Sequence, residues 1–224
     1  MPSSILLLSL RPGTEHMTKE VITNSAVTNI ITLHLTDTEG DYIIGNNKWS
    51  DGSRSDVVLE PKRLTSSLPP IIIEIQHSLD TNFMKRPVHY CLQAFDRYKS
   101  DLILLVLCPN RVSSNVPENK KAAHVSACYS FPCHFWVKEC LIVSKESVEV
   151  HKATAPLNPF VAVGMFCIHS TTPLVEANCS GDPTMVQLYN LALRYCQRII
   201  GNQRHLTEVL KDTLNTQEKS MCTC

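Results

Sequence analysis

Two acidic residues, Asp56 and Glu74, stand where they could bind one metal ion together. Asp56 opens the apolar run VVL, and Glu74 interrupts the later run IIIEIQ, so each belongs to a predicted strand. If these strands pair around the polar loop 62–70, both carboxylates reach the same end of the sheet. Two carboxylates, the backbone carbonyl of Ile75 and water form a set of oxygen ligands suited to Mg²⁺. We therefore expect a site for Mg²⁺ or Mn²⁺, ions that polarise phosphoryl oxygens and activate water.

Gln76 stands two positions after Glu74, and alternate residues of a strand share one face. The two side chains therefore project together, whereas His77 points the other way if the strand continues that far. In this arrangement Gln76 can position a water molecule beside the ion. Each acid also has a purely structural interpretation, because isolated acids at strand ends are common. Asp56 would then cap a strand end, and Glu74 would pair with a Lys or Arg.

The segment after these strands is the clearest helix in the sequence. Apolar residues recur at helical spacing on one face, and polar residues form a stripe on the opposite face. The apolar positions are Val88, Cys91, Leu92 and Phe95, and the polar ones are Arg86, Tyr90, Gln93 and Arg97. Pro87 suits a first helical turn, which places the start of the helix near Arg86. The run DLILLVLC (101–108) then predicts a strand that is covered on both faces.

The pattern SDVVL…PIIIEIQ, followed by this helix and strand, resembles the PD-(D/E)XK nuclease superfamily. In particular it looks like the transposase-associated, recombination-promoting branch, whose last motif is E-x-Q rather than E-x-K. Asp56, preceded by Ser55 in place of proline, matches the motif aspartate. Glu74 and Gln76 match the E-x-Q motif, and the resemblance spans residues 50–108. It implies a restriction-endonuclease-like core, metal bound by the two acids, and hydrolysis of phosphodiester bonds.

The resemblance also indicates where positive charge is needed. Gln76 takes the place of the superfamily lysine, and a neutral amide does not stabilise developing negative charge as an ammonium does. Lys85, Arg86 and His77 are the candidates to supply that charge. Lys85, Arg86 and Arg97 are also the expected contacts to nucleic-acid phosphates, although an ordinary solvated helix face is an equally weighted alternative.

Accessory residues are expected from two helices. The N-terminal helix of the superfamily often contributes another acid, for which Glu20 is the candidate here and Glu15 the reserve. Gln93 and Tyr98, from the helix that packs behind the site in the family, are the other accessory candidates.

The rest of the chain predicts elements of both types. A helix is expected at 15–33 and a hairpin at 32–44, where two apolar-alternating runs flank a turn at Gly40. Beyond residue 110 we expect a strand in 134–143 and helices at 185–200 and 203–214. A strand–helix–strand unit with an uninterrupted apolar strand predicts an α/β fold, here a restriction-endonuclease-like mixed β-sheet flanked by helices. Residues 1–110 form the predicted nuclease core, and residues 111–224 an α+β extension that completes it or is appended to it.

Two other clusters have chemical interpretations. Cys128, Cys133, His134 and Cys140 could bind zinc, but adjacent residues of a strand point in opposite directions and the spacing is not that of paired zinc knuckles. Buried thiols are therefore the favoured interpretation. Tyr129, Phe131, Phe135 and Trp136 could stack on bases, although such a cluster is more often part of a core.

Composition limits the classes of function. The chain of 224 residues has 21 Lys and Arg and 21 Asp and Glu, so its formal net charge is zero. This balance weighs against nucleic-acid binding by the whole surface and leaves room for a local basic groove. Ten cysteines, with no basic residue before the short apolar run Ile5–Leu10, indicate a reducing compartment rather than secretion. No run reaches the length of a membrane span, so we expect an intracellular protein, cytoplasmic or nuclear, with no membrane partner.

These observations predict metal-dependent hydrolysis of nucleic acid, with DNA the expected substrate. The rival hypothesis is a catalytically inactive relative of the same fold that binds nucleic acid or protein. Zero net charge and Gln76 both favour that rival.

Overall fold

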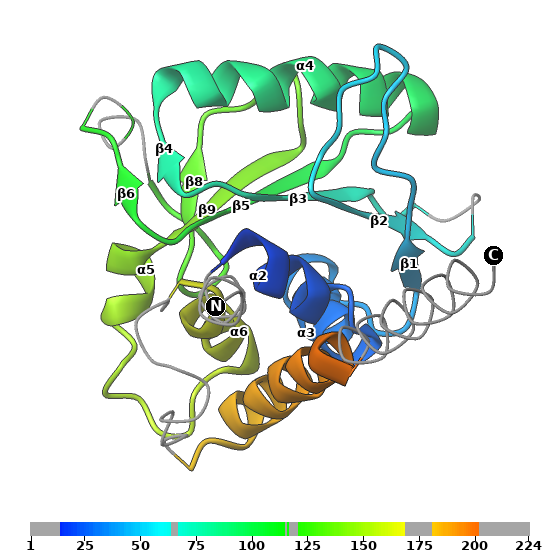
Figure 1. Cartoon of the computed structure of the whole chain (residues 1–224). Helices are drawn as coiled ribbons and strands as arrows, with labels where there is room; N and C mark the ends of the chain where they lie inside the picture. Colours follow the sequence, from blue (N-terminus) through cyan, green and yellow to red (C-terminus); the bar gives the residue numbers. More distant parts are fainter. Residues whose placement is uncertain (1–13, 64–66, 115, 117–120, 169–180, 202–224) are drawn as a thin grey trace, which may run out of the picture.

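The fold centres on one mixed sheet of seven strands, in the order β1-β2-β3-β5-β9-β8-β7 (Figure 1). The structure is a computed structural model, and it describes residues 14–63, 67–114, 116, 121–168 and 181–201. The strands are β1 (Tyr42–Ile44), β2 (Val57–Pro61), β3 (Ile71–Ile75), β5 (Ile103–Cys108), β7 (Lys121–Ala122), β8 (Tyr129–Phe131) and β9 (Glu139–Ser144). The central strands β3, β5 and β9 are parallel, and the outer pairs are antiparallel. The prediction of an α/β fold with a mixed sheet flanked by helices is confirmed.

Helices cover both faces of this sheet (Figure 1). One face carries α4 (Thr81–Tyr98), and the other carries α2 (Glu15–Ile22), α3 (Ser25–Thr36), α6 (Pro159–Ile168) and a helix at 183–201. The short α5 (Lys145–Glu149) follows β9, and β4 (Ser78–Leu79) pairs with β6 (Arg111–Val112) in a separate small sheet. Among the described residues, no helix is long and apolar enough to cross a membrane.

The central strands are buried on both faces, as their apolar runs predict. All six residues of β5 and all five of β3 are buried. Ile71, Ile73 and Ile75 pack in the core beneath α2, α3 and α6, whereas Ile72 packs beneath α4. Because side chains alternate along a strand, Glu74 faces α4 together with Ile72.

The prediction for the N-terminal region is right for the helix and wrong for the hairpin. The predicted helix is two helices, α2 and α3, and residues 32–36 belong to the last turns of α3 rather than to a strand. Asp37, in the left-handed conformation with φ 59°, ends that helix. β1 pairs with β2 instead, because its partner lies beyond the 46–55 loop.

The helix α4 begins at Thr81 and not near Arg86 as predicted. The Asp80 side chain caps it by accepting a hydrogen bond of 2.7 Å from the Phe83 N–H, so Pro87 lies inside the helix. The buried face consists of Phe83, Met84, Pro87, Tyr90, Cys91 and Ala94. The predicted faces are therefore partly wrong: Leu92 and Phe95 of the apolar face are 48% and 45% exposed, and Tyr90 of the polar stripe is buried.

The segment after residue 110 contributes to the same sheet. The predicted strand at 134–143 begins only at Glu139, and the apolar segment 159–168 is the helix α6. The helix predicted at 185–200 is present, whereas the one predicted at 203–214 lies outside the described residues. Because β9 pairs with β5, this region completes the sheet that the first 110 residues begin.

Candidate functional site

Asp56 and Glu74 meet where the antiparallel pairing of β2 and β3 ends. The register pairs Val57 with Ile73, which places Asp56 opposite Glu74 one step further on. The Asp56 N–H donates to Glu74 Oε1 at 3.0 Å, and the Ile75 N–H donates to Asp56 Oδ2 at 2.6 Å. The two carboxylates thus accept the hydrogen bonds that backbone carbonyls accept elsewhere in the ladder. This exchange fixes both acids at one end of the sheet, as the sequence predicts.

Glu74 is an almost completely buried carboxyl group, only 1% exposed. Burial is the main reason that its pKa is raised to about 7, and the negative charge of Asp56 adds to the shift. The Tyr90 hydroxyl, the Asp56 N–H and the Arg86 guanidinium, 3.7 Å from Glu74 Oε2, favour the charged form but do not outweigh burial. Near neutral pH the protonated and charged forms of Glu74 are therefore both populated in the metal-free protein.

Lys19 of α2 contacts one member of the acid pair, Asp56. Its Nζ lies 2.7 Å from Asp56 Oδ1 and 2.6 Å from Glu15 Oε1. Partial burial acts to lower the pKa of Lys19, but the hydrogen bonds and attraction of both carboxylates together raise it. The sequence predicts that this helix contributes an acid to the site. The residue that contacts Asp56 is instead Lys19, and Glu15 is linked to the site only through its ion pair with Lys19.

The acid pair offers two carboxylates to the magnesium or manganese ion that the sequence predicts, and each of them already faces a cation. Lys19 Nζ lies 2.7 Å from Asp56 Oδ1, and Arg86 Nη2 lies 3.7 Å from Glu74 Oε2. Mg²⁺ typically takes one or two carboxylates and keeps several waters. A buried carboxyl group whose pKa is raised is stabilised by a nearby cation, so Glu74 is suited to such a ligand role. The described residues contain no group of three or more His, Cys, Asp or Glu side chains that could hold a metal ion, so water would have to complete the coordination.

Gln76 and Ile75 lie beside the pair, at the end of β3. The Gln76 side chain is partly exposed, and its amide nitrogen donates to the Ser78 carbonyl at 3.0 Å. That contact leaves the amide oxygen as the atom able to accept a hydrogen bond from water. Ile75 contributes its N–H to Asp56, whereas the prediction concerns its carbonyl as a metal ligand. His77 is exposed at the strand end.

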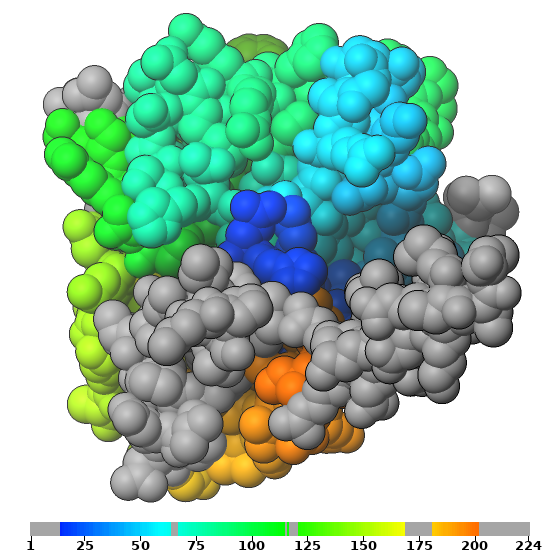
Figure 2. All heavy atoms as spheres, in the orientation of Figure 1, coloured from blue at the N-terminus to red at the C-terminus, as the bar shows by residue number. Residues whose placement is uncertain are grey.

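A basic pocket of about 340 Å³ lies on the α4 side, and two of its lining residues, Arg86 and Tyr90, also interact with Glu74. It is lined by Ser53, Arg54, Asn82, Lys85, Arg86, His89 and Tyr90. Lys85 and Arg86 are predicted phosphate contacts, and the structure adds Arg54 from the 46–55 loop. Figure 2 shows this loop (cyan) lying against α4 (teal), with α2 (dark blue) reaching the surface below them. The basic pocket is thus built between a helix and a loop that are distant in the sequence.

Arg97 and the accessory candidates Gln93 and Tyr98 secure elements around the site. The Arg97 guanidinium donates to the carbonyls of Asn46 and Lys48 and stacks 4.1 Å above the Trp49 ring. Gln93 Oε1 accepts from Ser50 Oγ at 2.7 Å and from the Asp51 N–H at 3.3 Å. Tyr98 donates to Glu60 Oε2 at 2.9 Å, on β2. These contacts hold the 46–55 loop and β2 against α4, which positions Arg54 and Asp56.

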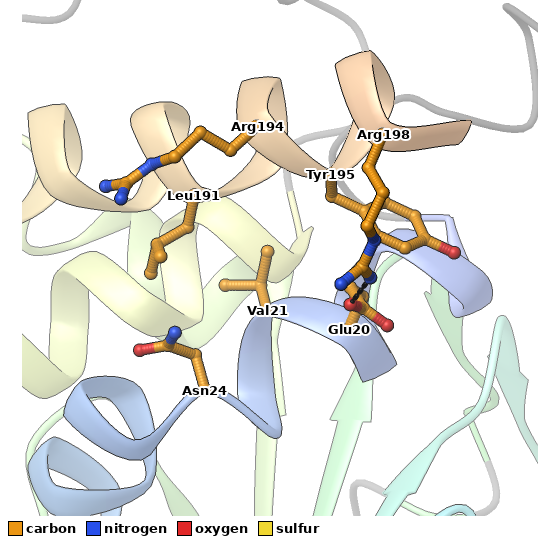
Figure 3. A pocket seen from close by; sticks show the side chains of 7 residues that line it. All are labelled: Glu20, Val21, Asn24, Leu191, Arg194, Tyr195 and Arg198. Carbon is orange, nitrogen blue, oxygen red and sulfur yellow. Dashed lines mark hydrogen bonds and ion pairs between the residues drawn. The ribbon is translucent and has the colours of Figure 1, made fainter. Parts of the chain in front are cut away.

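Glu20, the other accessory candidate, lies on a different face of α2 (Figure 3). It forms an ion pair with Arg198, and both residues line a pocket of about 300 Å³ between α2 and the helix at 183–201. The Tyr195 hydroxyl and His16 Nε2 form a hydrogen bond between the same two helices. These contacts anchor α2 and leave Lys19 directed toward Asp56.

The three cysteines occupy core positions, whereas the aromatic cluster is divided between the core and the surface. Cys128, Cys133 and Cys140 are buried, and burial is the main cause of the raised pKa of each thiol. His134 is exposed. Phe131 and Trp136 pack against the core beneath α4, whereas Phe135 is 97% exposed.

Comparison with known proteins identifies no relative. No protein-family profile, curated protein or solved structure matches this chain.

Proposed function

We propose that this protein is a metal-dependent nuclease of the PD-(D/E)XK type, related to the transposase-associated branch, which hydrolyses phosphodiester bonds in DNA. The observation that carries the proposal is the pairing of Asp56 with the buried Glu74, whose pKa is raised to about 7. A buried acid pair beside a basic pocket combines a place for a cation with a place for the phosphates that the cation acts on.

Each residue has a role in this proposal. Asp56 and Glu74 hold Mg²⁺ or Mn²⁺, with the Ile75 carbonyl as a further ligand. An ion held there would polarise the phosphoryl oxygen and lower the pKa of a water molecule. Gln76, on the same face of the strand as Glu74, accepts a hydrogen bond from that water and orients it.

The basic pocket supplies the contacts to the substrate backbone. Arg54, Lys85 and Arg86 line it, and phosphate contacts of this kind position a nucleic acid without reading its sequence. Arg97 acts indirectly, because its guanidinium is engaged by the carbonyls of the 46–55 loop. An enzyme of this kind meets DNA inside the cell, in the cytoplasm or nucleus, and that location is part of the proposal.

The second candidate is a catalytically inactive relative that binds nucleic acid or protein. One observation favours it: each acid has a cationic partner within the chain, Lys19 for Asp56 and Arg86 for Glu74. Gln76 adds to this alternative, since it provides no positive charge.

Cleavage of labelled oligonucleotides tests the proposal and its substrate class. Purified protein is incubated with single-stranded and double-stranded DNA and with RNA, in Mg²⁺, in Mn²⁺ and in EDTA. Metal-dependent cleavage of DNA that is lost in Asp56→Ala and Glu74→Ala is the expected result. Binding of DNA without cleavage under every condition would favour the inactive relative.

A further inference from the structure

The position of Lys19 bears on how the acid pair takes up a metal ion. We propose that the Lys19 ammonium is the resident counter-ion of Asp56, and that Asp56 binds a divalent cation only when this ammonium moves away toward Glu15. The inference rests on the proposed function, because it concerns the same metal site.

The two oxygens of Asp56 have different partners. Oδ2 accepts the Ile75 N–H at 2.6 Å, a bond that belongs to the end of the ladder. Oδ1 faces Lys19 Nζ at 2.7 Å, so the ammonium occupies the side of the carboxylate from which a cation would bind. An ammonium and a divalent ion on one carboxylate repel each other strongly. Binding of the ion at Oδ1 therefore requires the ammonium to leave.

Glu15 provides a second carboxylate with which the Lys19 ammonium can remain paired. Its Nζ also lies 2.6 Å from Glu15 Oε1, one helical turn earlier on α2. Glu15 is 62% exposed at its side chain and Lys19 is 33% exposed, so the flexible lysine stem can swing toward solvent while the ammonium stays paired. The exchange needs a change of side-chain rotamers only.

The helix itself stays in place during this exchange. Met17 and Ile22 of α2 are fully buried in the core. Glu20 pairs with Arg198 and His16 bonds to Tyr195, which ties the opposite side of α2 to the helix at 183–201 (Figure 3). The counter-ion can therefore change partners while the carboxylates remain fixed.

Two substitutions on α2 should change metal affinity in opposite directions. Lys19→Met removes the competitor, so metal binding tightens, by about tenfold or more if the ammonium stabilises Asp56 as ion pairs commonly do. Glu15→Gln removes the alternative partner of the ammonium, so Lys19 stays on Asp56 and metal binding weakens. A role for Lys19 that did not involve its charge would not produce this opposition.

The test is calorimetric titration of the full chain with MnCl₂, in the absence of nucleic acid. Variants are Lys19→Met, Glu15→Gln, Lys19→Arg, which keeps the charge, and Lys152→Met as a matched control. Lys152 forms a comparable ion pair with Glu149, 2.6 Å apart and remote from Asp56. Lys19→Arg and Lys152→Met should bind like the wild type, and circular dichroism confirms that each variant is folded.

The outcomes separate the inference from the proposed function. Tighter binding by Lys19→Met, with weaker binding by Glu15→Gln, supports the inference. Wild-type protein that binds Mn²⁺ with the same affinity as Lys19→Met overturns the inference alone. Folded wild type and Lys19→Met that both fail to bind Mn²⁺ overturn the metal site and the inference together. Binding by Lys19→Met alone supports the counter-ion role and counts against an active wild-type nuclease.

Discussion

Asp56 and Glu74 are joined by a hydrogen bond from the backbone of one to the side chain of the other, 3.0 Å from Asp56 N to Glu74 Oε1. Together with the bond from the Ile75 N–H to Asp56 Oδ2, it replaces the next rung of the β2–β3 ladder. Each acid is therefore both a structural acceptor and a candidate ligand. Substitutions at the pair must be judged by stability as well as by activity, and this dual role shapes the predictions below.

Glu74 should make the metal-free protein less stable as the pH rises. Its pKa is about 7 in the folded protein, above the ordinary value of 4.5. Below the ordinary value both folded and unfolded chains carry the proton, and between the two values the folded chain holds a proton that the unfolded chain has lost. The free energy of unfolding that this proton contributes therefore decreases as the pH rises through that window and is fully lost above pH 7. At about 1.4 kcal/mol per pKa unit, the total decrease is about 3 kcal/mol.

Urea unfolding at pH 5 and pH 8 measures this effect. Glu74→Gln should lose most of the difference between the two pH values, because an amide does not titrate. Adding Mn²⁺ at pH 8 should stabilise the wild type and not the variant. An equal pH dependence in both proteins would show that Glu74 titrates normally.

The stabilities of two Asp56 variants should separate the structural role of this residue from its role as a metal ligand. Asp56→Ala leaves the Ile75 N–H without its acceptor and should destabilise the fold by about 1–3 kcal/mol. Asp56→Asn keeps an oxygen for that bond and should cost less, while it weakens metal binding as much. Hydrogen exchange of the Ile75 amide reports the bond directly, with faster exchange expected in the alanine variant. Unchanged exchange would mean that the bond does not form in solution.

Arg97 should affect the 46–55 loop rather than the substrate. Arg97→Ala removes two charge-assisted hydrogen bonds and a cation–π contact with Trp49, a loss of about 1–3 kcal/mol. Trp49 is 3% exposed, so its fluorescence should shift to the red as the loop loosens. Lys99→Ala, at an exposed position two residues on, is the control that should change neither quantity. If Arg97→Ala keeps normal stability but weakens DNA binding, Arg97 contacts phosphate directly, as the sequence predicts.

The basic pocket should bind the phosphate backbone of DNA. Arg54→Gln, Lys85→Gln and Arg86→Gln should each weaken binding in EDTA, and each should reduce the slope of log affinity against log salt by about one. Arg54→Gln and Lys85→Gln should leave stability unchanged, since both side chains are exposed, whereas Arg86→Gln also removes the cation that lies 3.7 Å from Glu74 Oε2. Lys99→Gln, at the opposite end of α4, provides the matched loss of charge. If it weakens binding equally, the effect comes from net charge and not from the pocket.

The strands of the site could be predicted because their sequence signal is local. The short apolar runs VVL and III begin β2 and β3, and all six of these residues are buried, as such runs predict. Their order in the chain then places Asp56 and Glu74 at one sheet end. By contrast, the alternation at 32–36 suits a strand and a helix turn equally, and the packing of α3 in the core decides for the helix.

The residues that the prediction misses are those brought in by long-range contacts. Lys19 approaches Asp56 from another helix, and its only local signal is Glu15 four residues earlier. Arg54 reaches the basic pocket because Arg97 and Gln93 hold its loop against α4. The start of α4 is misjudged because Pro87 suits a first turn, whereas the Asp80 cap and the burial of Phe83 and Met84 extend the helix.

Nicking of supercoiled plasmid by purified protein tests the central claim most directly. Rates are compared for the wild type, Asp56→Asn and Glu74→Gln, with Asp96→Asn as a control, because Asp96 is an exposed acid of α4 that pairs with Lys99. We predict nicking that requires Mg²⁺ or Mn²⁺, falls by about a hundredfold or more in both pair variants and persists in the control. Equal nicking by all four proteins, or none by a wild type that binds Mn²⁺, would contradict the claim that Asp56 and Glu74 form a catalytic metal site.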